Sequence, residues 1–230
     1  MGESENSEIA KGIGMAAQKA LDFIEKLIAG PFMEGTGIFT DKVKYWRFKN
    51  QVDIITRARE HLKSKGINTP KKISIKDVTT LLEHASFEED EIMQDSWAKL
   101  LANTMNPENQ FDSSNIFIQI LNQLSVNEVY ILHFIYSNSF IMSSGDRPYF
   151  QRKELERNGR TQIAIKGLLI DNLLRLRLIE EEPPKLREEL KKRSDSFEYI
   201  EEDEIYSAII PSDKFRFSLF GVELTRQIFE

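Results

Sequence analysis

The apolar residues recur at helical spacing along most of the chain and alternate in the manner of strands only near its end. From residue 9 to residue 106, stretches between turn signals carry an apolar side chain every three or four positions, which predicts amphipathic helices. Apolar and polar residues alternate at 205–210 and 214–219, which predicts strands. We therefore expect a mostly α-helical protein with an N-terminal multi-helix module and a small β-ribbon in its second part.

Turn and capping residues set the limits of the first module. We expect a flexible tail at 1–8 and a helical module at 9–106. Within this module Gly66 is a natural helix stop, and Ser86 with Glu89 has the spacing of a capping box, which would start the helix that ends before Pro107. The predicted helices are at about 9–28 and 38–65, then from Ser74 to Ala85 and from Ser86 to Asn106.

The second module, 111–230, is predicted to be a winged-helix-like α+β module. Its pattern gives a helix after a second capping box at Ser125, a short helix at 151–157, a longer helix opened by Arg160, and then a ribbon. An acidic insertion at about 180–204 holds 11 acidic and 5 basic residues. It is longer than the 2–5 residues typical of a hairpin loop, so we expect it to be mobile.

The absence of cysteine from the 230 residues excludes a disulfide scaffold, a cysteine-ligated metal and a cysteine nucleophile. The three histidines lie far apart in the sequence and form no metal-ligand pattern. Arg57 and His61 approach the Arg–His motif of some toxin ribonucleases, but three residues separate them where that motif has four to six. We predict no metal and no cofactor, and binding is favoured over catalysis, with an enzymatic role left open.

Charge is segregated in the first module. Residues 42–76 hold 11 basic and 2 acidic residues, whereas 77–95 hold 7 acidic residues and no lysine or arginine. Two interpretations stay open: a solvated face neutralised by neighbouring carboxylates, which charge runs usually form, or a surface that binds nucleic acid or another polyanion. The side chains that would form such a surface are Lys42, Lys44, Arg47, Lys49, Arg57 and Arg59.

A winged helix can place its third helix in the DNA major groove. At the start of that predicted helix, the side chains that could read bases or contact phosphates are Arg160, Thr161, Gln162 and Lys166. The domain from residue 111 onward has 16 basic and 20 acidic residues, whereas DNA-binding domains are normally basic. Protein contacts are therefore an equally good interpretation of this fold.

The chain starts with the polar sequence MGESENSE and has no run of 18 apolar residues. These features predict a cytoplasmic protein without a transmembrane helix. The amphipathic helix predicted at 9–28 could dock on a membrane surface, but a core or subunit interface is the favoured interpretation. The partners left open are a second copy, a phage or host protein and nucleic acid, with peripheral membrane contact less favoured.

Two stretches of the chain carry a family resemblance. The first runs from GPF at 30–32 to DKVKYWRFKNQ at 41–51, and the second from ASFEEDE at 85–91 to WAKLLANTMN at 97–106. Both resemble the Abi-alpha (abortive infection alpha) family of bacterial proteins. We expect Tyr45, Trp46 and Phe48 to be core aromatics with Arg47 and Lys49 exposed, and the core of the last stretch is expected to contain Trp97, Leu100, Leu101 and Met105.

The resemblance implies a role in bacterial defence against phage, in which an infected cell stops growing or dies before the phage matures. It does not imply a known reaction. Two alternatives remain: a winged-helix transcriptional regulator that uses residues 160–166, and a membrane-perturbing effector that uses the N-terminal helix.

Overall fold

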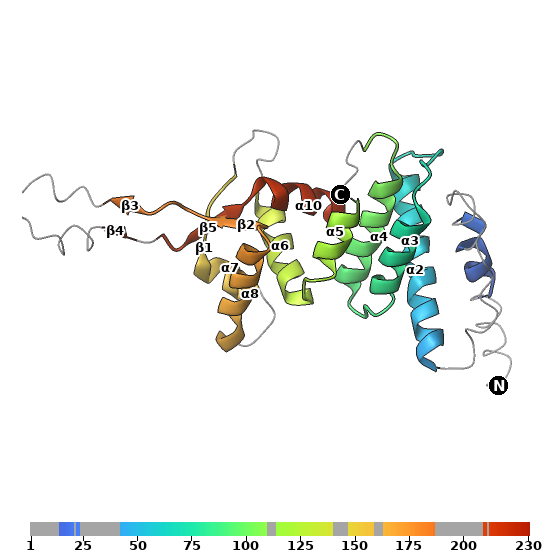
Figure 1. The fold of residues 1–230 in the computed structure, drawn as a ribbon, viewed down its shortest axis with the longest axis horizontal. Coiled ribbons are helices and arrows are strands. Elements are labelled where there is room, and N and C mark those ends of the chain that lie inside the picture. Colours follow the sequence, from blue (N-terminus) through green and yellow to red (C-terminus); the bar gives the residue numbers. More distant parts are fainter. Residues whose placement is uncertain are drawn as a thin grey trace, which may run out of the picture. The chain divides into compact units, whose positions relative to one another are not determined.

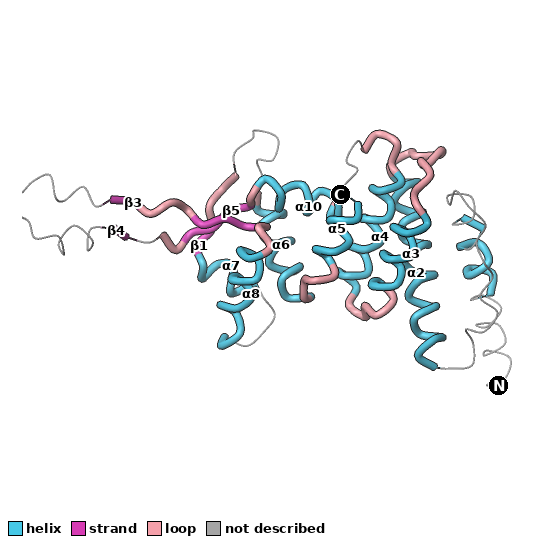
Figure 2. Tube along the Cα trace, in the orientation of Figure 1, coloured by secondary structure: helices cyan, strands magenta, loops and turns pink. Residues whose placement is uncertain are grey.

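The computed structural model describes residues 14–20, 22–23, 42–109, 114–139, 147–158, 163–186, 209–210 and 212–230. The protein is mostly α-helical with a three-stranded antiparallel sheet in its C-terminal part (Figures 1 and 2), as the apolar periodicity predicts. Two compact units make up the chain. Unit 1 comprises Met1–Val129 and Leu224–Glu230, and unit 2 comprises Tyr130–Glu223.

Unit 1 consists of helices. Residues 14–20 and 22–23 are helical and are the described part of the helix predicted at 9–28. The helices that follow are α2 (Lys42–Ser64), α3 (Ile75–Ala85), α4 (Glu91–Met105), α5 (Ser114–Leu121) and the first turn of α6 (Val126–Asn138). The core residues predicted for the segment 97–106 are confirmed. Trp97, Leu100, Leu101 and Met105 are buried.

The most extensive helix contact in unit 1 joins α2 and α4. The two helices run in the same direction, because His61 of α2 bonds to Asp95 and Lys65, just beyond α2, bonds to Asn103 further along α4. Ile54 and Trp97 are fully buried. α3 is the intervening element that reverses the chain between the two parallel helices.

Local chemistry fixes the predicted helix ends. Gly66, with φ of 72°, follows α2, and the Ile67 N–H donates to the Leu62 carbonyl at 2.9 Å. A left-handed residue at this position is the usual end of a helix, and glycine adopts it without a Cβ penalty. The Ser74 hydroxyl accepts a hydrogen bond from the Asp77 N–H at 3.1 Å and starts α3 as predicted.

The capping box predicted at Ser86 and Glu89 is wrong. Ser86 keeps helical dihedrals, φ −65° and ψ −16°, and ends α3. Asp90 has the extended backbone of an N-cap, and its carboxylate accepts from the Ile92 N–H at 2.9 Å. α4 therefore begins at Glu91, five residues after Ser86, and the intervening residues form a short link. The second predicted box is confirmed, since the Glu128 carboxylate accepts from the Ser125 N–H at 2.6 Å.

The C-terminal residues of the chain are part of unit 1. They form the end of α10 (Leu219–Phe229), whose last carbonyls have no partner within the helix. Lys99 of α4 donates to the Phe229 carbonyl at 2.8 Å, and the Asn103 amide donates to the Gln227 carbonyl at 2.9 Å. The amide of Asn109 donates to the Gln227 side chain at 2.9 Å. Side chains of unit 1 thus complete the hydrogen bonding of this helix end.

Unit 2 contains a small sheet with the strand order β1-β5-β2, all antiparallel. Its elements are β1 (Phe150–Gln151), α7 (Arg152–Asn158), α8 (Ile163–Arg175), β2 (Ile179–Glu181) and β5 (Lys214–Phe217). Phe215 and Phe217 are buried, and Glu180 lies directly opposite Arg216 with 2.8 Å between carboxylate and guanidinium. Such opposite-charge pairs across neighbouring strands help to fix the register.

The ribbon continues beyond this sheet as β3 (Lys185–Leu186) paired with β4 (Ile209–Ile210). Most of the acidic insertion predicted at 180–204 lies outside the described residues, which stop at 186 and resume at 209. Within the described parts, no helix has both the length and the apolar character needed to cross a lipid bilayer.

Gly221 at the start of α10 provides a stability prediction for unit 2. A Cβ at this position would stand 2.8 Å from the Leu178 carbonyl carbon, which belongs to the backbone that precedes β2. We expect Gly221→Ala to destabilise the protein by about 1–3 kcal/mol, the usual cost of overpacking. Urea unfolding followed by circular dichroism measures this.

The matched control is Gly167→Ala in α8, where an added Cβ meets nothing within 4 Å. Alanine is the better helix former, so this variant should gain up to about 1 kcal/mol. Equal stabilities of the two variants would contradict the close approach of α10 to Leu178.

Candidate functional site

The structure describes the side chains of four of the ten residues predicted to bind a polyanion: Arg47, Lys49, Arg57 and Arg59. The other six have side chains outside the described parts: Lys42, Lys44, Arg160, Thr161, Gln162 and Lys166. The first two of these belong to α2, and Lys166 belongs to α8. A base-reading role for the start of α8 therefore stays a prediction.

Arg47 is half-buried, not on the exposed side of α2 as expected. Its Nε donates to the Ser86 hydroxyl at 3.1 Å, and its guanidinium carbon lies 4.3 Å from the centre of the Phe87 ring. The Ser86 hydroxyl in turn donates to the Glu83 carbonyl at 2.7 Å. Arg47 therefore ties α2 to the end of α3, and its guanidinium lies over the Phe87 ring in a cation–π contact.

Trp46 and Lys49 lie on the exposed side of α2. The expectation that Trp46 belongs to the core is wrong, because 57% of its surface is exposed. The ammonium group of Lys49 lies 5.7 Å from the centre of the Trp46 ring, within the range of a cation–π contact. Lys49 is exposed as predicted. The structure places Tyr45 in α2, but the environment of its side chain is outside the described parts.

The basic residues of 42–76 and the acidic residues of 77–95 are joined by few ion pairs among the described residues. Among the described residues, the one ion pair between α2 and residues 77–95 is that of His61 with Asp95, at 2.9 Å. Within the same set, Lys49, Arg57 and Arg59 form no ion pair with a carboxylate. The carboxylates of residues 77–95 therefore do not pair with these three cations, and the acidic residues of α2 itself are Asp53 and Glu60.

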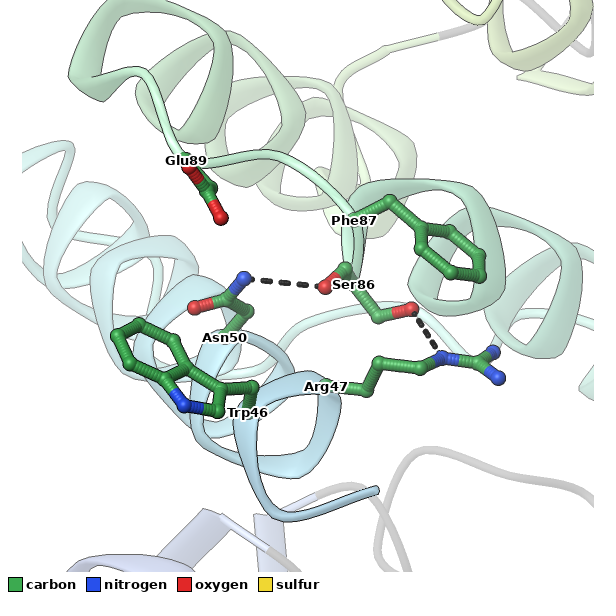
Figure 3. A pocket seen from close by; sticks show the side chains of 6 residues that line it. All are labelled: Trp46, Arg47, Asn50, Ser86, Phe87 and Glu89. Atoms are coloured by element: carbon green, nitrogen blue, oxygen red, sulfur yellow. Dashed lines mark hydrogen bonds between the residues drawn. The ribbon is translucent and has the colours of Figure 1, made fainter. Parts of the chain in front are cut away.

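An open pocket lies between α2 and the link that joins α3 to α4 (Figure 3). Its volume is about 270 Å³. The residues that line it are Trp46, Arg47, Asn50, Ser86, Phe87 and Glu89. Asn50 is 7% exposed, and its amide nitrogen donates to the carbonyls of Ser86 and Glu88, both at 3.0 Å. The floor is thus a rigid polar framework, while Trp46 and Phe87 expose their rings at the sides.

The amide oxygen of Asn50 accepts no hydrogen bond from any residue in the described parts of the chain. Figure 3 shows this oxygen on the side of the amide that faces Trp46, with the nitrogen directed toward Ser86. Among the described residues the Trp97 indole nitrogen is the one buried side-chain polar atom without a partner, so the Asn50 oxygen is open to solvent in the pocket. The pocket therefore offers one acceptor between two aromatic rings.

Glu88, next to the pocket, carries an unfavourable charge. Burial raises the pKa of this carboxyl, and the nearby carboxylate of Asp90 raises it further. The indole N–H of Trp97 faces the carboxyl and partly offsets the rise without reaching hydrogen-bond geometry; it has no partner among the described residues. The backbone carbonyl of Glu88 accepts from both Asn50 and Gln94, which fixes the link despite the buried charge.

A second polar cluster joins His61, Asp95 and Lys99. Asp95 contacts the His61 ring at 2.9 Å and the Lys99 ammonium at 3.2 Å. Burial acts to raise the pKa of Asp95, but the two basic partners outweigh it and hold the pKa below its usual value. Lys99 also donates to the end of α10, so this cluster holds three elements together. The described residues contain no group of three or more potential metal ligands.

The pocket is not predicted by the sequence patterns, although both segments that form it carry the family resemblance. All six lining residues lie within 41–51 and 85–91, the two segments that carry the resemblance. Asn50, Ser86 and Phe87 were not among the predicted binding residues. A sequence signal for this pocket is the occurrence of an aromatic, a cationic and an amide side chain within the five residues 46–50 of α2.

Comparison with known protein families gives a match over most of the chain. The model of a family described as abortive infection alpha matches residues 47–228. The matched segment begins at Arg47 in the pocket and contains both units apart from residues 1–46 and the last two residues. Searches of curated proteins and of solved structures find no significant match.

Asn50→Ala tests whether this amide holds the pocket together. The substitution leaves two backbone carbonyls without a donor from this side chain. We expect a loss of about 1–3 kcal/mol in the free energy of unfolding, measured by urea denaturation. Gln51→Ala is the control, since Gln51 makes a single longer bond, 3.3 Å, to the Leu82 carbonyl. A loss no larger than that of the control would contradict the framework role.

Glu88→Gln should make stability less dependent on pH. Because the folded-state pKa of Glu88 is raised above its ordinary 4.5, the folded protein loses stability as pH rises above that value. Glutamine removes the charge, so we expect the variant to be more stable than wild type at neutral pH. The difference should vanish below the ordinary pKa, where the carboxyl is protonated in both states.

Urea unfolding of both proteins between about pH 4 and pH 7 measures the effect. The control is Glu89→Gln, one residue further along and exposed. A wild-type protein that is equally or more stable than Glu88→Gln at neutral pH would contradict the raised pKa.

Proposed function

Because the chain belongs to the abortive infection alpha family, we propose that it defends a bacterial population against phage by abortive infection. The observation that carries this proposal is the extent of the family match, which spans residues 47–228 of 230. In abortive infection the infected cell stops growing or dies before progeny phage mature, so neighbouring cells survive.

The pocket supports binding as the mode of action. Its polar floor is held by hydrogen bonds from Arg47 and Asn50, which leaves little freedom for these groups to move during a reaction. Its sides are exposed aromatic rings, and exposed aromatics next to cations are typical of recognition surfaces. The partner classes remain a second copy of the chain, a phage or host protein, and nucleic acid.

Unit 2 supports a winged-helix fold class for the second module. Its elements follow the order helix, strand, helix, helix and a two-stranded ribbon, and the first strand pairs with the last. We keep the regulator function as a weaker alternative, because the residues that would read DNA lie outside the described side chains.

A phage challenge tests the proposed function. Bacteria that express the chain should survive infection at a low ratio of phage to cells, whereas the culture should collapse at a high ratio. The control strain carries the same gene with an early stop codon. Equal growth of the two strains against a broad phage panel at every ratio would contradict the proposal.

A further inference from the structure

The pocket between α2 and the α3–α4 link combines features that suit one class of ligand. Trp46 and Phe87 expose 57% and 62% of their surfaces, far more than aromatic side chains in a core. They stand on either side of Asn50, as Figure 3 shows. Flat aromatic faces that remain in water are stacking platforms for other flat groups.

Each ring already has a cation against it. The Arg47 guanidinium covers the Phe87 ring, and the Lys49 ammonium lies near the Trp46 ring. The bond from Arg47 to Ser86 uses its Nε, so the hydrogen-bond donors at the outer end of the guanidinium have no partner among the described residues. Positive charge therefore lies beside both stacking surfaces.

Acceptors lie inside and at the rim of the same pocket. The Asn50 oxygen has no donor among the described residues, and Glu89 is exposed at the edge. A ligand that fits must present N–H donors on a flat ring and negative charge outside it. Nucleobases carry amino and imino donors on their edges, and their phosphates supply the charge.

The basic face of α2 extends this surface beyond the pocket. Lys49, Arg59 and Lys63 are exposed, and none is ion-paired among the described residues. Lys49 and Lys63 are about 21 Å apart along the axis, at 1.5 Å per helical residue. That distance exceeds the reach of a mononucleotide, since each strand of B-DNA carries one phosphate per about 3.4 Å of helix axis. Asp53 and Glu60 reduce the charge of this face without reversing it.

We propose that the pocket formed by Trp46, Asn50 and Phe87 binds an unpaired base of single-stranded nucleic acid, with the strand following the basic face of α2. The base stacks on Trp46 and donates a hydrogen bond to the Asn50 oxygen. The phosphates contact Lys49 and the cations that follow it. This inference rests on the proposed function, in which the protein acts by binding, and it specifies the class of ligand.

A duplex does not meet these requirements, because its bases are already stacked and paired. A protein partner would need apolar side chains to cover the rings, and the cations next to both rings favour a polyanion instead. DNA and RNA strands share the chemistry described here, so the experiment includes both.

The test is fluorescence anisotropy of the full chain with labelled 15-residue oligonucleotides of dT, rU and a matched duplex. We expect binding to a single strand that weakens with salt and exceeds binding to the duplex. Trp46→Ala should weaken it between about fivefold and a hundredfold, the range for loss of one base-stacking contact. Because Trp46 is mostly exposed, this variant should keep the wild-type melting temperature.

Two control substitutions separate stacking and charge from general effects. Ile116→Ala removes another exposed apolar side chain, on α5, and should leave the affinity unchanged. Lys49→Ala with Lys63→Ala should lower the slope of log affinity against log salt by about 0.7 for each lysine. Lys76→Ala, at the opposite end of α3 from the pocket, should not change that slope.

The outcomes are distinct from those of the phage challenge. Binding to dT, to rU or to both that exceeds binding to the duplex and weakens in Trp46→Ala supports the inference. Binding that Trp46→Ala does not weaken, equal binding to the duplex, or no binding to any oligonucleotide overturns it. A change of oligomeric state in Trp46→Ala without oligonucleotide binding also overturns it, since the pocket would then be a subunit interface. Loss of phage protection alone concerns only the proposed function.

Discussion

The parallel packing of α2 against α4 is the constraint on which the rest of unit 1 depends. It buries Ile54 and Trp97 completely and aligns the polar edges of the two helices. At one end of the contact Asn50 reaches the link before α4, and further along His61 reaches Asp95. Because α2 and α4 are parallel, the chain must travel back from the end of α2 to the level of its start before α4 begins. α3 and its links make this connection. The pocket lies where this return path rejoins α4.

The link between α3 and α4 is ordered by side chains rather than by a regular element. Arg47, Asn50 and Gln94 satisfy its hydroxyl and carbonyl groups from two different helices. These bonds use the polar atoms and leave the ring of Phe87 in water. Buried polar groups must be satisfied, whereas an aromatic ring can be exposed at a moderate cost. The same framework therefore explains both why the link is fixed and why its aromatic side chain is free to recognise a ligand.

The sequence predicted what local chemistry decides. Gly66 ended α2, Ser74 started α3, and strict alternation located β5. It failed where two local signals compete, since Ser86 and Asp90 are both good helix caps four residues apart. The outcome is set by bonds from Arg47 and Asn50, 36 to 39 residues earlier, which no local pattern contains. The exposure of Trp46 and the return of the last residues to unit 1 depend in the same way on tertiary packing.

The segregated charges of unit 1 follow from the uses that the fold makes of its carboxylates. Asp77 and Asp90 are committed to the starts of α3 and α4, and Asp95 is paired inside the α2–α4 contact. Carboxylates placed at helix N-termini are stabilised by the helix dipole, and among the described residues neither Asp77 nor Asp90 forms an ion pair with α2. The cations on the outer face of α2 therefore still create a local positive electrostatic potential, although the chain as a whole has a net charge of −6. A chain that is acidic in total can thus present a local surface suited to a polyanion.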